Sequence, residues 1–206
     1  MIRIWGRTSS INVQKVMWTV AELGLAHERV DAGGAFGGLD TPHYAAMNPN
    51  RLIPVIRDGE TVVWESNAIV RYLAARYGSG GLWPEDPVLR ATSDRWMDWQ
   101  LTVVQPAISP VFHGLIRTAP EKRDMAAIQA GAERLGAAMR ILDAQLADRP
   151  FLAGDTPTIG DIPIGCVCWR YYNLDVVRPE LPNVLAYRAR LEERAGYRAH
   201  VMLPLT

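Results

Sequence analysis

The sequence changes character near residue 80, and this change limits the possible folds more than any other feature. Before it, short β-like runs alternate with amphipathic helical runs, whereas no convincing strand pattern follows it. The stretch Gly78–Pro87 between the two parts is rich in glycine and proline, which is typical of a connecting segment. We therefore predict an α/β domain over residues 1–78, a linker over 79–86 and an all-α helical bundle over 87–206.

The first part is predicted to form one mixed sheet with helices on its faces, because its elements follow the order β-α-β-α-β-β-α. Its strongest signal is Asp58-Gly59, a dipeptide typical of hairpin loops between two apolar runs. The predicted strands are 2–5, 28–31, 54–57 and 61–63, and the predicted helices are 11–23, around 44–47 and 66–78. In the second part, helical spacing of apolar residues predicts helices at 88–117, 121–146, 159–172 and 182–193.

The composition excludes several classes of protein. Hydrophobic residues make up 49% of the chain and charged residues 21%, as in ordinary globular proteins. Twenty-two basic residues balance 22 acidic ones, so the net charge favours neither nucleic acid nor an anionic membrane as a partner. The N-terminus lacks the apolar region of a signal peptide, and no uncharged stretch reads as a membrane span. We expect a soluble, cytoplasmic protein.

The two cysteines, Cys166 and Cys168, are too close along a helix to pair with each other, and the chain has no third. A disulfide scaffold is therefore excluded, as is a zinc site with four Cys or His ligands at motif spacing. We expect both side chains to be small buried apolar groups, and we expect no metal.

Three segments of the first part contain residues suited to binding a ligand. In the first of them, Ser9, Ser10 and Asn12 stand where a strand leads into a helix. A serine at this position is most often a simple helix cap. Its hydroxyl can also donate to an anionic ligand, which the helix N-terminus attracts. No base is marked nearby, so such a serine is a hydrogen-bond donor rather than a nucleophile.

The other two segments are the starts of a strand and of a helix. A cis bond between Ile53 and Pro54 would leave the Ile53 backbone free to pair with an extended, peptide-like ligand. Ser66 can bind a carboxylate at a helix start, and Glu65 beside it can bind an ammonium group. Structural alternatives exist for both segments, namely a proline at a sheet edge and an ordinary helix cap.

With these three segments in this order, the chain resembles the glutathione S-transferase family of the cytosolic type. Ser10–Val16 is similar to the serine motif of the phi and theta-like classes, and Asn48–Pro54 and Glu65–Leu73 are similar to the glutathione-binding segments. Phe151–Ile162 resembles the capping segment of the C-terminal domain, and we interpret its Thr158–Asp161 as a structural capping box. The resemblance covers the whole chain and implies a thioredoxin-like α/β domain followed by an all-α domain.

The resemblance implies an enzyme that activates the glutathione thiol as a thiolate for attack on a small hydrophobic electrophile. Ser10 would donate to the sulfur, with Asn12 as a second catalytic residue. The implied glutathione-binding residues are Arg51, Ile53, Pro54, Glu65 and Ser66, and the implied electrophile pocket contains Trp5, Arg7, Trp96, Trp99 and Phe112. Glutathione would be a co-substrate, and the protein would be a homodimer. The apolar hairpin region and first long helix also favour a dimer.

The chain departs from the family pattern at two places. Leu39-Asp40 stands where phi-like relatives carry a basic pair, and Arg51-Leu52 replaces the usual Gly-Lys or Gly-Gln, so Arg51 is the candidate for holding the glycyl carboxylate. Asn12 occurs where the zeta class has cysteine, which argues against a maleylacetoacetate isomerase. The sequence leaves open whether Ser10, Asn12 or Ser9 contacts the sulfur. A glutathione-dependent disulfide or peroxide reductase and a non-catalytic binding module are the alternative functions.

Overall fold

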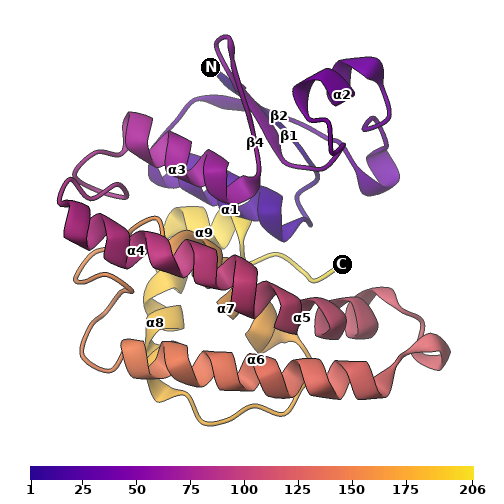
Figure 1. Cartoon of the computed structure of the whole chain (residues 1–206), viewed down its shortest axis with the longest axis vertical. Coiled ribbons are helices and arrows are strands. Elements are labelled where there is room, and N and C mark those ends of the chain that lie inside the picture. Colours follow the sequence, from indigo (N-terminus) through magenta and orange to yellow (C-terminus); the bar gives the residue numbers. More distant parts are fainter.

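The computed structural model describes residues 1–206 and contains the two parts that the sequence predicts, a sheet with helices and a helical bundle (Figure 1). Four strands form one mixed sheet in the order β2-β1-β3-β4. The predicted fold class is confirmed. The elements of the first part are β1 (Ile2–Trp5), α1 (Ile11–Glu22), β2 (His27–Val30), the 3₁₀ helix η1 (Gly34–Phe36), α2 (Pro42–Met47), β3 (Val55–Asp58), β4 (Thr61–Trp64) and α3 (Ser66–Tyr77).

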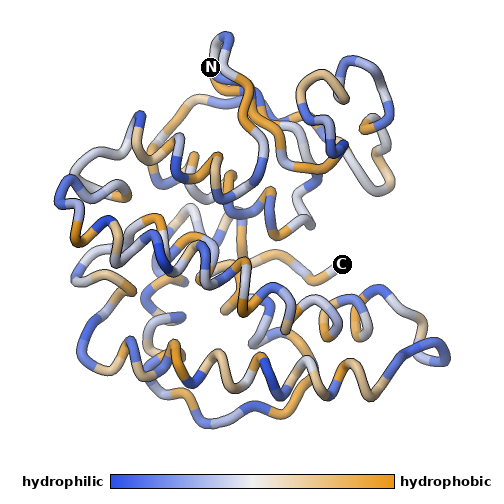
Figure 2. The backbone as a smooth tube through the Cα atoms, viewed as in Figure 1, coloured by the Kyte–Doolittle hydropathy of each residue, from blue (hydrophilic) through white to orange (hydrophobic).

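Helices cover both faces of the sheet. β1 runs parallel to β2 and antiparallel to β3, and β3 runs antiparallel to β4. Because successive side chains of a strand point to opposite faces, Ile4 and Trp5 of β1 enter different cores. Ile4 is buried with apolar side chains of α1 and α3, whereas Trp5 is buried with Tyr44 and Met47 of α2. In Figure 2 both the strands and the helices carry hydrophobic and hydrophilic residues side by side, as expected of elements with one face in a core.

The second part is built from helices. One continuous helical run contains α4 (Pro87–Trp99), the π-helical turn η2 (Gln100–Val104), α5 (Gln105–Phe112) and a second π-helical turn, η3 (His113–Arg117). It is followed by the 3₁₀ turn η4 (Pro120–Lys122), α6 (Met125–Gln145), α7 (Asp161–Asn173), α8 (Pro182–Glu192) and α9 (Ala195–His200). None of these helices combines the length and apolar character that crossing a lipid bilayer requires.

Most predicted elements are found within one or two residues of their expected ends; for example, strands 28–31 and 54–57 are observed at 27–30 and 55–58, and the helix predicted from 159 begins at 161. Three differences are larger. The helix predicted from residue 121 begins only at Met125, because Asp124 caps it by accepting the Ala127 N–H at 2.9 Å. The helix predicted over 88–117 has the expected extent but contains two π-helical turns. The short helix α9 was not predicted. Its Tyr197 packs edge-to-face on Trp18 of α1 with ring centroids 4.9 Å apart, so α9 closes the larger core against the first part.

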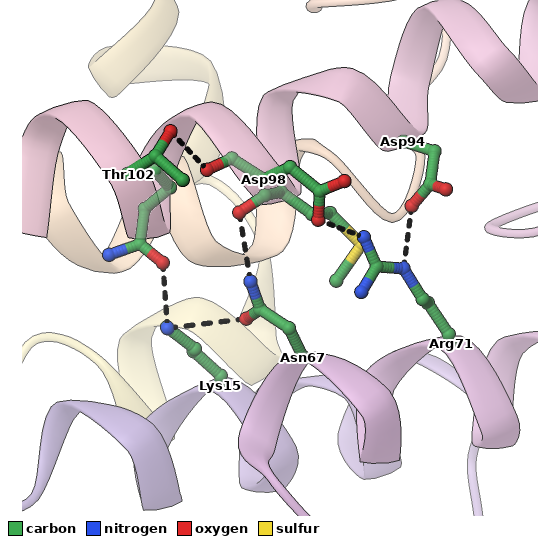
Figure 3. A network of polar contacts seen from close by, with 8 residues as sticks. Lys15, Asn67, Arg71, Asp94, Asp98 and Thr102 are labelled. Atoms are coloured by element: carbon green, nitrogen blue, oxygen red, sulfur yellow. Dashed lines mark hydrogen bonds and ion pairs between the residues drawn. The ribbon is translucent and has the colours of Figure 1, made fainter.

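The contact between the two parts contains a buried lysine. Lys15 of α1 is fully buried, and its ammonium group donates to Asn67 Oδ1 of α3 at 3.2 Å and to Gln100 Oε1 at 2.9 Å (Figure 3). Asn67 in turn donates to the Met97 carbonyl of α4 at 3.0 Å. Beside this group, Arg71 of α3 reaches two aspartates of α4 at 2.6 Å each. Polar contacts from α1 and α3 therefore hold α4 against the first part.

Burial makes the charge of Lys15 costly. Its pKa is lowered from 10.5 to about 8, mainly because removal from water disfavours the charged form, with nearby Arg170 adding to the effect and Cys166 and Glu65 opposing it. Both acceptors of the ammonium group, the amide oxygens of Asn67 and Gln100, are neutral. The two hydrogen bonds occupy two of the three ammonium protons but supply no compensating charge.

This burial predicts a specific dependence of stability on pH. Between the folded pKa of about 8 and the unfolded value of 10.5, the unfolded chain binds more protons at this site, so raising the pH stabilises the folded state. We expect the difference in unfolding free energy between wild type and Lys15→Met to shift in favour of wild type by about 2 kcal/mol from about pH 7 to pH 10, measured by urea denaturation. Lys122→Met, at an exposed site, should keep the wild-type slope, and parallel curves for wild type and Lys15→Met would contradict this account.

A second buried charge organises the start of α7. The carboxylate of Asp161 accepts the Leu152 N–H at 3.1 Å, the Thr158 N–H at 2.7 Å and the Tyr187 hydroxyl at 2.9 Å. Burial raises the pKa of this carboxyl group, while these hydrogen bonds oppose the rise. The Thr158–Asp161 segment is therefore a structural element that joins the 151–158 loop, α7 and α8.

We expect Asp161→Ala to reduce the free energy of unfolding by about 3 kcal/mol or more, because four buried donors, the Thr158 hydroxyl among them, would lose their acceptor. Chemical denaturation of the variant measures this loss. Asp155→Ala is the matched control, since Asp155 lies in the same loop but is exposed. A stability of Asp161→Ala equal to that of the control would refute the structural assignment.

Candidate functional site

The start of α1 meets the start of α3 at one edge of the first part. Ser10 precedes α1 in an extended conformation, and its side chain makes no capping hydrogen bond to the helix. Ser66 is buried at the first position of α3, and its hydroxyl donates to Asn12 Oδ1 at 3.2 Å. Two of the three segments singled out in the sequence are thus joined directly, and the Ser10 hydroxyl stays available for another partner.

The third segment approaches the sheet through the predicted cis peptide bond between Ile53 and Pro54, which the structure confirms. The loop before it is fixed by its Leu52 carbonyl, which accepts the Tyr44 hydroxyl at 2.8 Å and the Asn48 side-chain amide at 2.9 Å. The backbone N–H and C=O of Ile53 take part in none of the hydrogen bonds within the chain. Both groups can therefore pair with an extended ligand.

Two charged residues of the predicted site have left-handed backbone conformations. Arg51 has a φ of 54° and Glu65 a φ of 69°, values that side-chain-bearing residues rarely adopt. Both side chains are exposed. Arg51 lies 3.4 Å from a carboxylate oxygen of Asp40, the residue that replaces a basic one in phi-like relatives. Unusual backbone conformations at positions next to a binding surface are commonly retained for function.

A cavity of about 160 Å³ opens beside Ser10 and Asn12, between the first part and the helical bundle. Its apolar lining comes from Ile11 of α1 and from Ile108 and Phe112 of α5. The remaining lining residues are polar or charged: Arg7, Ser10, Asn12, Gln105, Ser109, His113, Arg117 and Arg170. The cavity therefore brings together Ser10, Asn12, Arg7 and Phe112 of the sequence-predicted site.

The three tryptophans assigned to the electrophile pocket do not line this cavity. Trp5 is 9% exposed and belongs to the core beneath α2. Trp96 is 6% exposed and packs edge-to-face on Trp99, with ring centroids 5.0 Å apart, against the core of the bundle. All three therefore pack into the two cores.

Apart from Arg7, the charged residues of the cavity were not predicted from the sequence. His113 and Arg117 come from the π-helical turn η3, and Arg170 comes from α7, far along the chain. These residues are linked only by a shared cavity, which depends on the contact of Arg170 of α7 with the Phe112 ring of α5 and on the altered helical register in η3. Burial and the neighbouring arginines lower the pKa of His113, so its imidazole is neutral at pH 7.

Comparison with known proteins agrees with this geometry. Residues 9–76 match the family model described as "Glutathione S-transferase, N-terminal domain", and residues 125–190 match "Glutathione S-transferase, C-terminal domain". The chain is 42% identical over 208 aligned positions to glutathione S-transferase GstB of Escherichia coli strain K12, with all of both chains covered. It is 34% identical to glutathione S-transferase 3 of Zea mays, over 78% of this chain and 73% of the relative.

Solved structures give the same result. The crystal structure of the theta class glutathione S-transferase from the citrus canker pathogen Xanthomonas axonopodis pv. citri, with glutathione bound, superposes with a TM-score of 0.96. The two chains are 45% identical, and the match covers 100% of this chain and 99% of the other. Family models, a full-length relative and this structure agree, and the chain belongs to the glutathione S-transferase family.

Proposed function

We propose that the protein binds glutathione, holds its thiol as a thiolate and transfers it to a small electrophile. The observation that carries the proposal is the unused hydroxyl of Ser10 at the start of α1, facing a cavity between the two parts. A hydroxyl and a helix N-terminus both stabilise a negative charge in front of them. The thiolate is the nucleophilic form of a thiol, so stabilising it raises the reactive fraction at neutral pH.

The tripeptide is proposed to lie along the three joined segments. The free backbone groups of Ile53, beside Pro54, pair with the cysteinyl residue of glutathione. Glu65 and Ser66 hold the α-ammonium and α-carboxylate groups of the γ-glutamyl residue, and Arg51 holds the glycyl carboxylate. Asn12 links this row to the sulfur site, because it neighbours Ser10 and accepts the Ser66 hydroxyl. Glutathione in the crystal structure of the Xanthomonas relative supports this co-substrate.

We expect Ser10→Ala to raise the pKa of the bound thiol by about one to two units, because one hydrogen bond to an ionised sulfur contributes about 1.5–3 kcal/mol. The thiolate absorbance of the glutathione complex, followed over a pH titration, measures this change. Glutathione affinity should stay nearly intact, since the two ends of the tripeptide are held elsewhere. Ser9→Ala is the control and should keep the wild-type thiol pKa. If the thiol pKa is unchanged in Ser10→Ala but shifts in Ser9→Ala or in Asn12→Ala, the sulfur contact belongs to that other residue.

Glu65→Gln should weaken glutathione binding and leave the thiol pKa unchanged, which is the reverse of the result expected for Ser10→Ala. We expect glutathione to bind roughly thirtyfold more weakly by calorimetry, because the ammonium group would lose its charged partner. The pKa of the thiol that does bind should stay at the wild-type value, since Glu65 holds the far end of the tripeptide. Wild-type affinity in Glu65→Gln would remove this residue from the proposed binding site.

A homodimer and a cytoplasmic location belong to the same proposal. Exposed apolar side chains at Trp64 of β4 and at Leu101 and Val103 of η2 support an interface that pairs the hairpin region with the first long helix. Two free, buried cysteines suit a reducing compartment. Light scattering at micromolar concentration should give twice the mass of one chain, and a monomer would exclude the dimer.

A further inference from the structure

Three arginines face the cavity beside Ser10 without an aspartate or glutamate partner. Arg7 follows β1, Arg117 ends η3, and Arg170 belongs to α7. No aspartate or glutamate lines the cavity, and none of the three arginines takes part in an ion pair. The chain as a whole carries equal numbers of acidic and basic residues, so this local excess of positive charge is a property of the site.

Two of these guanidinium groups stack near one aromatic ring. The Cζ atom of Arg170 lies 4.0 Å and that of Arg117 lies 5.0 Å from the centroid of the Phe112 ring. Arg170 is only 7% exposed and donates to the Ser9 carbonyl at 3.1 Å, yet its Nε has no hydrogen-bond partner. Arg117 donates to the Thr206 main-chain oxygen at 3.4 Å. Both guanidinium groups therefore keep donors that can serve a further acceptor.

The pKa values of two of these arginines reflect their unfavourable surroundings. Burial, followed by the charges of Arg117 and Arg7, lowers the pKa of Arg170 to about 10. Burial and the charge of Arg7 lower the pKa of Arg117. Arg170 still carries its charge at pH 7, and so does Arg117, because guanidinium groups stay protonated in proteins. Arg170 is buried whereas Arg117 is exposed and Arg7 is partly buried, so the unfavourable charge lies mainly on Arg170 unless an opposite charge joins it.

We propose that the electrophile of this protein carries a carboxylate, which the arginines of the cavity bind while its reactive carbon faces the sulfur. This inference rests on the proposed function, since Ser10 marks the position of the sulfur. A carboxylate matches the planar, forked donors of arginine. The cavity has roughly the volume of five water molecules at about 30 Å³ each, so the substrate is small. This proposal differs from the hydrophobic electrophile that the family resemblance implies, because the electrophile proposed here is anionic and has a short carbon frame.

A conjugated carboxylic acid shows how the reaction balances. The thiolate sulfur forms a bond to one alkene carbon, and the π electrons move onto the carbon next to the opposite carbonyl as an enolate. The enolate then takes one proton from solvent, which replaces the proton that the thiol released on ionisation. The product is a thioether, no bond to a leaving group breaks, and no oxidant or reductant is needed.

Monomethyl fumarate and dimethyl fumarate form a matched pair for the test, because they differ only in one carboxylate against one methyl ester. The rate constant kcat/KM for each is divided by its uncatalysed rate constant with glutathione, which removes the difference in intrinsic reactivity. We expect the wild-type enzyme to favour the monoester over the diester at least about tenfold on this scale. Equal enhancements would overturn the proposal while leaving the proposed transferase activity in place.

Arg117→Gln should reduce this preference about tenfold, whereas Arg134→Gln, at an exposed site on α6, should keep it. If the arginines act only on the thiolate, Arg117→Gln slows both esters equally and the ratio stays unchanged, which overturns the proposal. Calorimetry with glutathione adds a second check. If Arg117→Gln loses much of its glutathione affinity while its preference for monomethyl over dimethyl fumarate is unchanged, the arginine binds the co-substrate. That result also overturns the proposal.

The saturated esters separate a failure of this inference from a failure of the proposed function. Monomethyl succinate and dimethyl succinate cannot react, so their affinities for the enzyme saturated with S-methylglutathione report the anion site alone. Tighter binding of the monoester to wild type, lost in Arg117→Gln and kept in Arg134→Gln, supports the site even if neither fumarate is turned over. Equal affinities of the two succinates overturn it.

Discussion

The buried ammonium group of Lys15 joins three helices that have to be fixed relative to one another before a site can exist between them. Lys15 is on α1, five residues after Ser10, and its partners are Asn67, next to Ser66 on α3, and Gln100, the first residue of η2 directly after α4. One side chain therefore couples the position of the sulfur-facing segment, the segment with Glu65 and Ser66, and the first long helix. Because the ammonium group is desolvated, any displacement of these helices would expose unpaired polar groups, and the arrangement is correspondingly specific.

The site has two halves of different character. The half on the α/β part is made of backbone groups and small polar side chains, namely the Ile53 peptide and the hydroxyls of Ser10 and Ser66. These groups suit a ligand that resembles a peptide. The half on the bundle is made of long cationic side chains around Phe112. Such a division allows the bundle half to change its ligand while the α/β half keeps the same co-substrate.

Local patterns in the sequence were sufficient for the α/β half. Asp58-Gly59 marks the hairpin, and the segments around Ser10, Pro54 and Ser66 each lie at the start of an element whose type is set by nearby residues. The bundle half depended on contacts between distant residues. Arg170 lies 163 positions after Arg7, and only the packing of α7 beside the first part brings them to one cavity. The helix α9 has six residues, too few for a periodic pattern, and is held by Tyr197 against Trp18. The burial of Trp5 could not be predicted from the sequence either, because the neighbouring residues do not indicate which face of the sheet α2 covers.

The π-helical turn η3 lets the first long helix carry one extra residue without moving the Arg117 charge away from the cavity. In an α-helix, residues five positions apart are separated by about 140° around the axis, so Phe112 and Arg117 would face different directions. A π-helical turn places such residues nearly above one another, which is how the Arg117 guanidinium comes to lie over the Phe112 ring. Losing one residue between them would restore the α-helical register and leave the arginine four positions after Phe112, about 40° away around the axis and still on the same helix face. The π-helical turn therefore takes up one extra residue while the guanidinium group stays over the ring, and relatives that lack this residue could keep the same contact with an ordinary α-helix.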